Sequence, residues 1–358
     1  MKKNARFLVL ILMSIFILSA CGTDNKATSS EGNEEKGALN IYTTLYPLEY
    51  FTKQIGGDYV EVSSILPPGT DAHTFEPTSK TVLEIAEADL FIYNNVDMEA
   101  YAETIIDALK DDVTAVEASA GISLLQGEHE HDHNGTTEEA EHEHDSEEGH
   151  SEETHTEEEH SEEAHMEEEG HSEEAHTEEE HNHGEADPHV WLDPIRAISV
   201  AENIKNTLIE MKPEAKQDFE ANFADLKTKL EKLDEDFHNQ LESKERNEIL
   251  VTHAAYGYWE EAYGLEQISI SGLSSTNEPS QKQLEEVIQT VEELEIHYLL
   301  FEQNVTPKVA KVIQSETKVE SLQIHNLAVL TEEDIDADED YFTLMNKNLE
   351  VLLTALEN

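Results

Sequence analysis

The sequence predicts an α/β protein of two lobes, each with a mostly parallel sheet and flanking helices. One long rigid helix is expected to join the lobes, and a disordered histidine-rich acidic loop to interrupt the first. Three observations support this. Short apolar segments alternate with amphipathic ones in both halves of the chain, as in βαβ units. A charged helical pattern runs between the halves. One segment of the first half has almost no apolar residues.

The expected elements follow in order along both halves. In the first half we expect strands at 39–44, 60–66 and 90–93, and helices at 48–55, 79–87 and 99–109. In the second half we expect strands at 248–252, 267–271, 297–301 and 319–324, and helices at 256–263, 280–294, 307–315 and 341–356.

Residues 213–244 form the expected linking helix, between an N-terminal lobe at 38–212 and a C-terminal lobe at 245–358. Its apolar residues recur at close to helical spacing: Phe219, Phe223, Leu226, Leu230 and Leu233. No glycine or proline follows Pro213 within this segment, so a helix of about nine turns, roughly 48 Å long, is expected. Such a helix is a stiff connection.

The start of the chain has the pattern of a targeting segment. Residues 1–20 have a basic start and an apolar run too short for a comfortable membrane span, which indicates a signal peptide. The run ends in Leu18-Ser19-Ala20-Cys21, which resembles the bacterial lipobox, so lipidation at Cys21 is expected. The alternative is an ordinary secreted protein with an incidental cysteine. Polar residues 21–37 are expected to be a flexible tether.

The net charge of −59 argues against nucleic acid as a partner, because phosphate binding requires basic patches. Of the 81 acidic residues, 27 fall between Glu128 and Asp187, which leaves 54 against 22 basic residues, or −32, elsewhere. The remainder is therefore acidic too, as in soluble surface-exposed domains. The single cysteine excludes a disulfide framework and a multi-thiolate metal site.

The acidic segment at 128–187 holds most of the histidines. Thirteen of the 19 occur in this histidine tract: His129, His131, His133, His142, His144, His150, His155, His160, His165, His171, His176, His181 and His183. With so little apolar surface the tract is expected to be disordered and exposed. Imidazoles suit Zn²⁺, Cu²⁺ and Ni²⁺, so we interpret it as a metal-collecting loop; the alternative is a charged spacer. Its match to H-E-x-x-H at 129–133 is an accident of composition, since that protease motif needs a stable helix.

Six histidines lie outside the tract, and three of them stand in stiff loops. His73 follows a strand in a Pro/Gly-rich loop, His189 precedes a helix, and His253 ends the strand at 248–252. Strand ends are where α/β folds place ligands. Each alone could be an ordinary hydrogen-bonded histidine; together the three indicate a metal site.

These stretches resemble the metal-binding lipoproteins of bacterial ABC importers, specifically the high-affinity zinc uptake type (ZnuA/AdcA-like). The markers are PPGTDAHTFEP, DPHVWLDP, VTHAAYGY and NEPS, and the likeness runs from about residue 38 to residue 358. It implies two α/β lobes joined by a long helix, with metal between them and His73, His189 and His253 as ligands. Manganese members carry a carboxylate at the position of His253, so histidine there favours zinc.

The sequence departs from that family at the fourth ligand. Many members place a carboxylate in the loop before the last helix, where this chain has Ala328. Water, Glu302 or a histidine of the tract could take the position. Of the other histidines, we interpret His325 as structural and His238 as solvent-facing, and His297 has no evident partner.

The resemblance implies a monomeric solute-binding protein, anchored by lipid to the extracytoplasmic face of the cell membrane. It would capture Zn²⁺ and deliver it to an ABC permease with its ATPase, and it would not be an enzyme. A zinc hydrolase is the first alternative, because three protein ligands plus water is also a catalytic pattern. The sequence shows no convincing general base for one. The second alternative is a surface adhesin, for which it shows no adhesion repeat.

Overall fold

The computed structural model describes residues 37–110, 112–126, 186–274, 279–302 and 308–357. The described residues from Ala38 onward form one compact unit, to which all that follows refers. The predicted signal peptide, the lipidation site Cys21, the tether and the thirteen tract histidines lie outside the described residues. None of the helices in the described part combines the length and apolar character that a membrane crossing requires.

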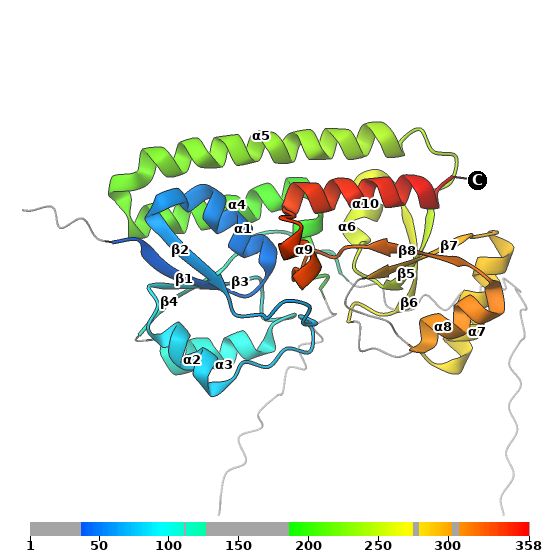
Figure 1. Ribbon diagram of the computed structural model, residues 1–358, viewed down its shortest axis with the longest axis horizontal. Coiled ribbons are helices and arrows are strands. Elements are labelled where there is room, and N and C mark those ends of the chain that lie inside the picture. The colour runs from blue at the N-terminus through cyan, green and yellow to red at the C-terminus, as the bar shows by residue number, and fades with distance from the viewer. Residues whose placement is uncertain (1–36, 111, 127–185, 275–278, 303–307, 358) are drawn as a thin grey trace, which may run out of the picture. The chain divides into compact units, whose positions relative to one another are not determined.

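The N-terminal lobe is built on a four-stranded sheet of order β2-β1-β3-β4. Its strands are β1 (Leu39–Thr43), β2 (Val60–Ser64), β3 (Leu90–Tyr93) and β4 (Thr114–Glu117). Its helices are α1 (Tyr46–Gly56), α2 (Ser79–Ala86), α3 (Ala100–Leu109) and α4 (Pro194–Met211). All pairings are parallel, and helices α1 and α4 lie on the opposite side of the sheet from α2 and α3 (Figure 1). Burial from both sides explains the wholly apolar β3, in which every residue is buried.

The C-terminal lobe repeats this plan with the order β6-β5-β7-β8, again wholly parallel. Its strands are β5 (Glu248–His253), β6 (Glu266–Ser271), β7 (Tyr298–Glu302) and β8 (Glu320–Ile324). Its helices are α6 (Gly257–Tyr263), α7 (Gln281–Glu293), α8 (Lys308–Thr317), α9 (Glu332–Asp336) and α10 (Tyr341–Ala355). The predicted fold class, two parallel α/β lobes with flanking helices, is confirmed.

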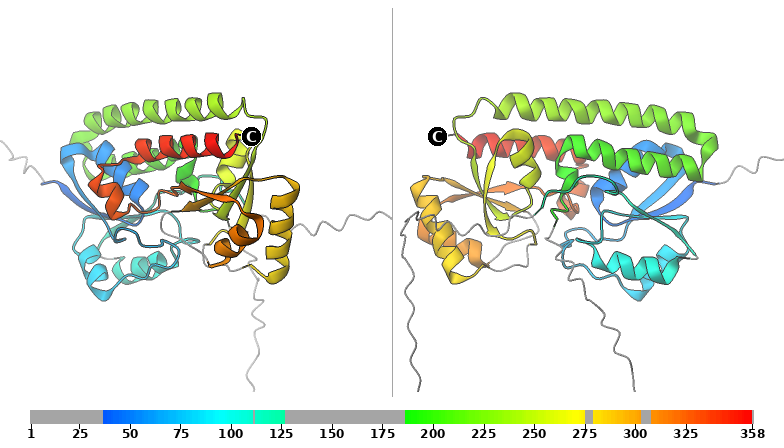
Figure 2. Two further views of the ribbon diagram at one scale, coloured as in Figure 1. Left: turned by 45° about the vertical axis from the view of Figure 1, so that its right-hand side comes forward. Right: turned by 180° about the vertical axis from the view of Figure 1, so that it is seen from behind.

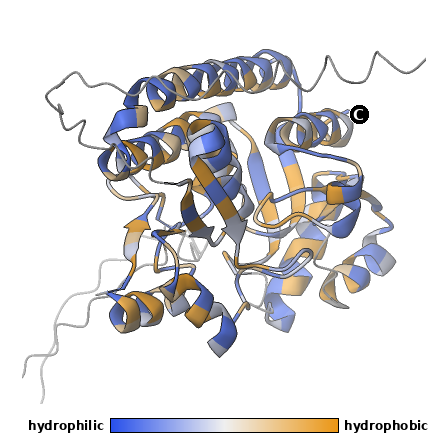
Figure 3. Cartoon of the chain, turned by 60° about the vertical axis from the view of Figure 1, so that its left-hand side comes forward, coloured by the Kyte–Doolittle hydropathy of each residue, from blue (hydrophilic) through white to orange (hydrophobic). Residues whose placement is uncertain are grey.

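Helix α5 (Lys216–Leu241) lies between the two lobes in sequence and runs along both of them (Figures 1 and 2). It packs on α1 and α4 of the first lobe and on α6 and α10 of the second. Its ends differ from the expected 213–244, because Pro213 opens a separate 3-10 turn (Pro213–Ala215) and the chain leaves the helix after Leu241. The 26 residues span about 39 Å rather than 48 Å. One face of α5 is apolar and the other polar (Figure 3).

One cluster of buried apolar residues is continuous through both lobes. At the junction it includes Trp191, Trp259 and Tyr341, all at most 1 % exposed. The Tyr341 hydroxyl donates to the Trp191 carbonyl at 2.6 Å, and its ring meets that of Phe51 in α1 with centroids 5.0 Å apart. Helix α10 therefore packs across the junction. A smaller apolar cluster lies between the second sheet and helices α7 and α8.

Candidate metal centre

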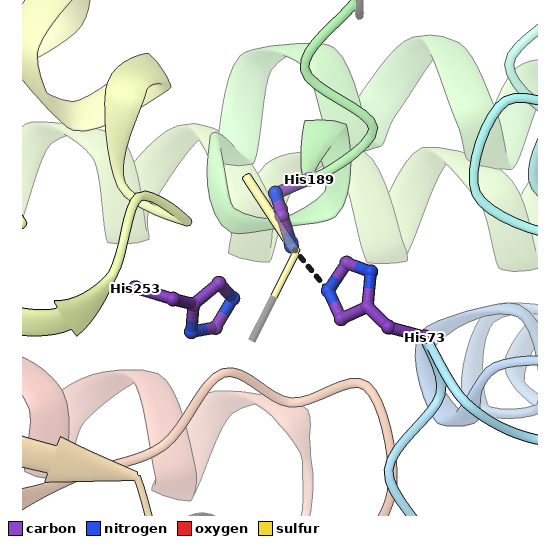
Figure 4. A group of neighbouring side chains, drawn as sticks. All are labelled: His73, His189 and His253. Carbon is purple, nitrogen blue, oxygen red and sulfur yellow. Dashed lines mark hydrogen bonds between the residues drawn. The ribbon is translucent and has the colours of Figure 1, made fainter. Parts of the chain in front are cut away.

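Three histidines from three separate segments meet between the lobes. His73 lies in the loop between β2 and α2, His253 is the last residue of β5, and His189 comes just before a 3-10 turn, Val190–Leu192. Strands β2 and β5 present their carboxyl ends toward this region, as expected of ligand sites in parallel sheets. Figure 4 shows the three rings pointing toward a common space.

The ligand-type nitrogens of the three rings all lie within 4.8 Å of one another. The Nε2 atoms of His73 and His189 are 3.3 Å apart, and the three ring centroids are separated by 5.3 to 5.6 Å. His189 and His253 are each 1 % exposed, whereas His73 is half-buried. The structure thus brings together the three histidines that the sequence singled out.

A carboxylate stands behind each of the two buried rings. Asp187 Oδ1 lies 2.8 Å from Nδ1 of His189 and also accepts the His189 backbone N–H at 2.9 Å. Glu302 Oε1 lies 2.5 Å from Nδ1 of His253. Each Nδ1 therefore faces a carboxylate, as a hydrogen-bond contact in His189 and as an ion-pair contact in His253, and each Nε2 is turned to the central space. Both ring nitrogens of His253 are buried, and neither has hydrogen-bond geometry to a partner among the described residues, although Nδ1 lies at ion-pair distance from Glu302.

Burial and charge set the protonation of this cluster. Burial, reinforced by the neighbouring His189 and His253, lowers the pKa of His73 to about 3, so its ring is neutral near pH 7. Burial also lowers the pKa of His253, but the Glu302 carboxylate outweighs this and the net pKa is raised. Burial conversely raises the pKa of Glu302, which His253 outweighs, so that pKa is lowered. In the free protein, His253 and Glu302 form a buried, charge-assisted pair.

Glu302 occupies a different position from the one expected of a fourth ligand. It is not part of the group of converging ligand atoms, which in the described chain consists of the three histidines. Its Oε1 also accepts the Tyr256 hydroxyl at 3.3 Å, and its Oε2 accepts the Asn326 amide at 2.7 Å. With all these contacts, Glu302 is placed to orient His253.

The loop that carries Ala328 is bound from several sides. Asn326 accepts the Trp191 indole N–H through its carbonyl at 2.8 Å, and the Ala328 carbonyl accepts the backbone N–H of Tyr46 at 2.9 Å. Leu327 is held in the left-handed region, at φ 59°. The methyl group of Ala328 is buried and supplies no ligand atom.

The other described histidines lie outside the cluster. His325 is buried and contacts Asp334 Oδ2 through Nε2 at 3.2 Å, while its Nδ1 accepts the Leu327 N–H at 2.8 Å. His238 is exposed on α5 beside the ring of Tyr263, with centroids 4.9 Å apart. His297 is exposed just before β7. These positions agree with a structural His325 and a solvent-facing His238.

The supporting role of Asp187 was not anticipated from the sequence. The signal that could have revealed it is the Asp-Pro-His spacing, because an Asp two residues before a His reaches both its backbone N–H and its Nδ1.

Two parallel α/β lobes with a histidine cluster between them define the class of two-lobed solute-binding proteins. The sequence pattern of one family, described as ZnuA, zinc-uptake complex component A, periplasmic, matches residues 41–355. The chain belongs to this family.

Individual relatives agree. The chain is 35% identical over 341 residues to the zinc-binding lipoprotein AdcA of Streptococcus pneumoniae, covering 95% of this chain and 60% of that protein. The chain thus spans about 60% of the length of the streptococcal relatives it matches. It is 31% identical over 350 residues to the high-affinity zinc uptake system protein ZnuA of Bacillus subtilis, covering 98% of this chain and 97% of that protein. The Zn(II)-bound ZnuA-like domain of S. pneumoniae AdcA superposes with a TM-score of 0.67 at 32% identity, over 90% of this chain and 100% of that domain.

Proposed function

We propose that this protein captures Zn²⁺ outside the cytoplasm and delivers it to the permease and ATPase of an ABC importer. The convergence of His73, His189 and His253 within 4.8 Å carries the proposal. Relatives whose names describe zinc binding or zinc uptake support it, as does the family to which the chain belongs.

The donor set and its spacing suit zinc. Two ligand atoms at about 2.05 Å from a tetrahedral ion lie about 3.3 Å apart, the separation of the Nε2 atoms of His73 and His189. Imidazole is a preferred zinc ligand, and the carboxylates of Asp187 and Glu302 fix the ring orientations that expose Nε2. Since Ala328 offers no donor, we infer that water completes the coordination.

The site favours binding over catalysis. Hydrolysis at zinc requires a general base beside the metal-bound water. The carboxylates of Asp187 and Glu302 are both engaged with ligand rings, and that of Asp71 accepts the backbone N–H of His73 at 2.9 Å. They are therefore placed to hold the ligands.

The remaining parts of the proposal concern Cys21 and the histidine tract, which lie outside the described residues. Lipidation at Cys21 would keep the protein at the membrane beside its permease. The thirteen histidines of the tract would gather zinc at modest affinity, and the ordered cluster would then bind it tightly.

A competition titration against a zinc chelator tests the assignment. The variants are the chain without residues 128–184, the same chain with His73, His189 and His253 changed to Ala, and a control with His238→Ala. We expect the shortened chain and the His238 control to retain one tight zinc site. The triple variant should lose at least about 1,000-fold in affinity. Unchanged affinity in the shortened triple variant would overturn the site.

A further inference from the structure

The hydroxyl group of Tyr258 joins the C-terminal lobe to both chain segments that flank residues 127–185. The side chain is fully buried on α6, and its hydroxyl donates to the Asp187 carbonyl at 2.7 Å. The same hydroxyl accepts the Leu125 N–H at 3.3 Å. The two segments also hold each other, since the Asp187 N–H donates to the Leu125 carbonyl at 2.7 Å next to a bridge between Gln126 and Ala186.

The neighbouring Gly257 provides the space that Asp187 needs. A Cβ atom at Gly257 would lie 2.8 Å from Oδ2 of Asp187, closer than a carbon and an oxygen approach without displacement. The Asp187 carboxylate therefore rests against the start of α6. Helix α6 therefore holds the Asp187 backbone through the Tyr258 hydroxyl and leaves room for the Asp187 carboxylate at Gly257.

Asp187 in turn orients His189. Its Oδ1 lies 2.8 Å from Nδ1 of His189 and 2.9 Å from the backbone nitrogen of the same residue. A carboxylate at this position selects the tautomer with the proton on Nδ1, so that Nε2 carries the lone pair a metal requires. His253, another member of the cluster, ends the strand that leads into α6.

We propose that Tyr258 is a positioning residue for zinc: its hydroxyl, with the space at Gly257, seats Asp187 and thereby aims Nε2 of His189 at the ion. The inference rests on the proposed function. Helix α6 would then position two ligands: His253, which ends the strand leading into this helix, and His189, which contacts Asp187.

The test compares Tyr258→Phe with Gly257→Ala and with the control Tyr263→Phe in the full-length protein. Tyr263 lies on the same helix, and its hydroxyl donates to Asp234 of α5 at 3.1 Å, outside the cluster of His73, His189 and His253. Zinc affinity is measured against a chelator strong enough to leave only the tightest site loaded. The visible spectrum of the Co²⁺-loaded protein reports the ligand geometry, and thermal unfolding without metal reports the cost of losing each hydroxyl.

Loss of an outer-shell partner weakens metal binding by about 10- to 100-fold. We expect about 10-fold for Tyr258→Phe, about 10- to 100-fold for Gly257→Ala, and an altered Co²⁺ spectrum in both. Tyr263→Phe should lower thermal stability without changing affinity or spectrum. If Tyr258→Phe matches Tyr263→Phe in zinc affinity and in spectrum, the positioning role is refuted. Failure of the proposed function would look different, because then His253→Ala would leave zinc affinity unchanged.

Discussion

Replacing Glu99 with glutamine is expected to stabilise the protein at alkaline pH. Glu99 precedes α3 and is fully buried, and its Oε2 accepts the backbone N–H groups of Asn94 at 2.7 Å and Asn95 at 3.1 Å. Burial raises its pKa from the ordinary 4.5 to about 7, although the hydrogen bonds from the two backbone amides act in the opposite direction. The folded protein therefore holds this proton more tightly than the unfolded chain does.

The sign and size of the effect follow from proton linkage. Because the folded pKa lies above the unfolded one, stability is lost as pH rises from about 4.5 through about 7. At about 1.36 kcal/mol per pKa unit, the loss is about 3 kcal/mol at pH 8 and about 1.4 kcal/mol at pH 5.5. Glutamine keeps an acceptor for the two amides and has no proton to lose. We therefore expect Glu99→Gln to exceed the wild type by these amounts.

Urea unfolding in the presence of a chelator measures the difference without a contribution from bound metal. The control is Glu103→Gln, which removes an exposed carboxylate from the same helix. We expect the control to stay within about 0.5 kcal/mol of the wild type at both pH values. A Glu99→Gln advantage that does not shrink between pH 8 and pH 5.5 would refute the linkage argument, and so would a variant less stable than the wild type at pH 8.

The remaining predictions concern the metal site and the linking helix. Glu302→Gln should weaken zinc binding by about 10- to 100-fold in chelator competition, because Nδ1 of His253 loses its carboxylate; equal affinity would exclude the orienting role. Zinc affinity should fall as pH is lowered, because protons compete for His253, whose pKa is raised by Glu302; titrations at pH 8, 7 and 6 would show it, and a flat profile would contradict it. Ala328→Glu should slow zinc release in stopped-flow chelation by adding a fourth donor, and faster release would argue against a carboxylate reaching the ion from this loop. Phe237→Ala should cost about 3–5 kcal/mol in urea unfolding, against almost nothing for the half-exposed Lys227→Ala, since Phe237 is fully buried on α5.

Much of the fold could be predicted because the central strands β3 and β5 are buried on both faces. The segment Leu90–Tyr93 is apolar throughout and bounded by helical patterns, so its strand is evident from the sequence. Strand β4, Thr114–Glu117, was not expected, because a short strand at the edge of the sheet with no fully buried residue has no such pattern. Helix α9, Glu332–Asp336, is too short for a helical period to appear.

Part of the candidate metal site could likewise be predicted from the sequence, and part could not. The three histidines could be found because each stands at a strand end or in a rigid loop, which local sequence reveals. The position of Glu302 could not be deduced, because the end of a strand does not determine whether a carboxylate reaches the central space or the far edge of a neighbouring ring. That choice depends on tertiary contacts such as those of Glu302 with Tyr256 and Asn326.

The apolar cluster that continues through both lobes limits how the protein could release zinc in its proposed function. Swinging the lobes apart would expose Trp191, Trp259 and Tyr341 to water, at about 1.5–3 kcal/mol or more for each large side chain. Wide opening is therefore a rare excursion, and the molecule should melt as one cooperative unit. A bound ion would then leave past the loop of His73, because among the three histidine rings only that of His73 is half-buried. If the protein releases zinc as proposed, movement of this loop would remove one ligand while the two lobes stay packed together.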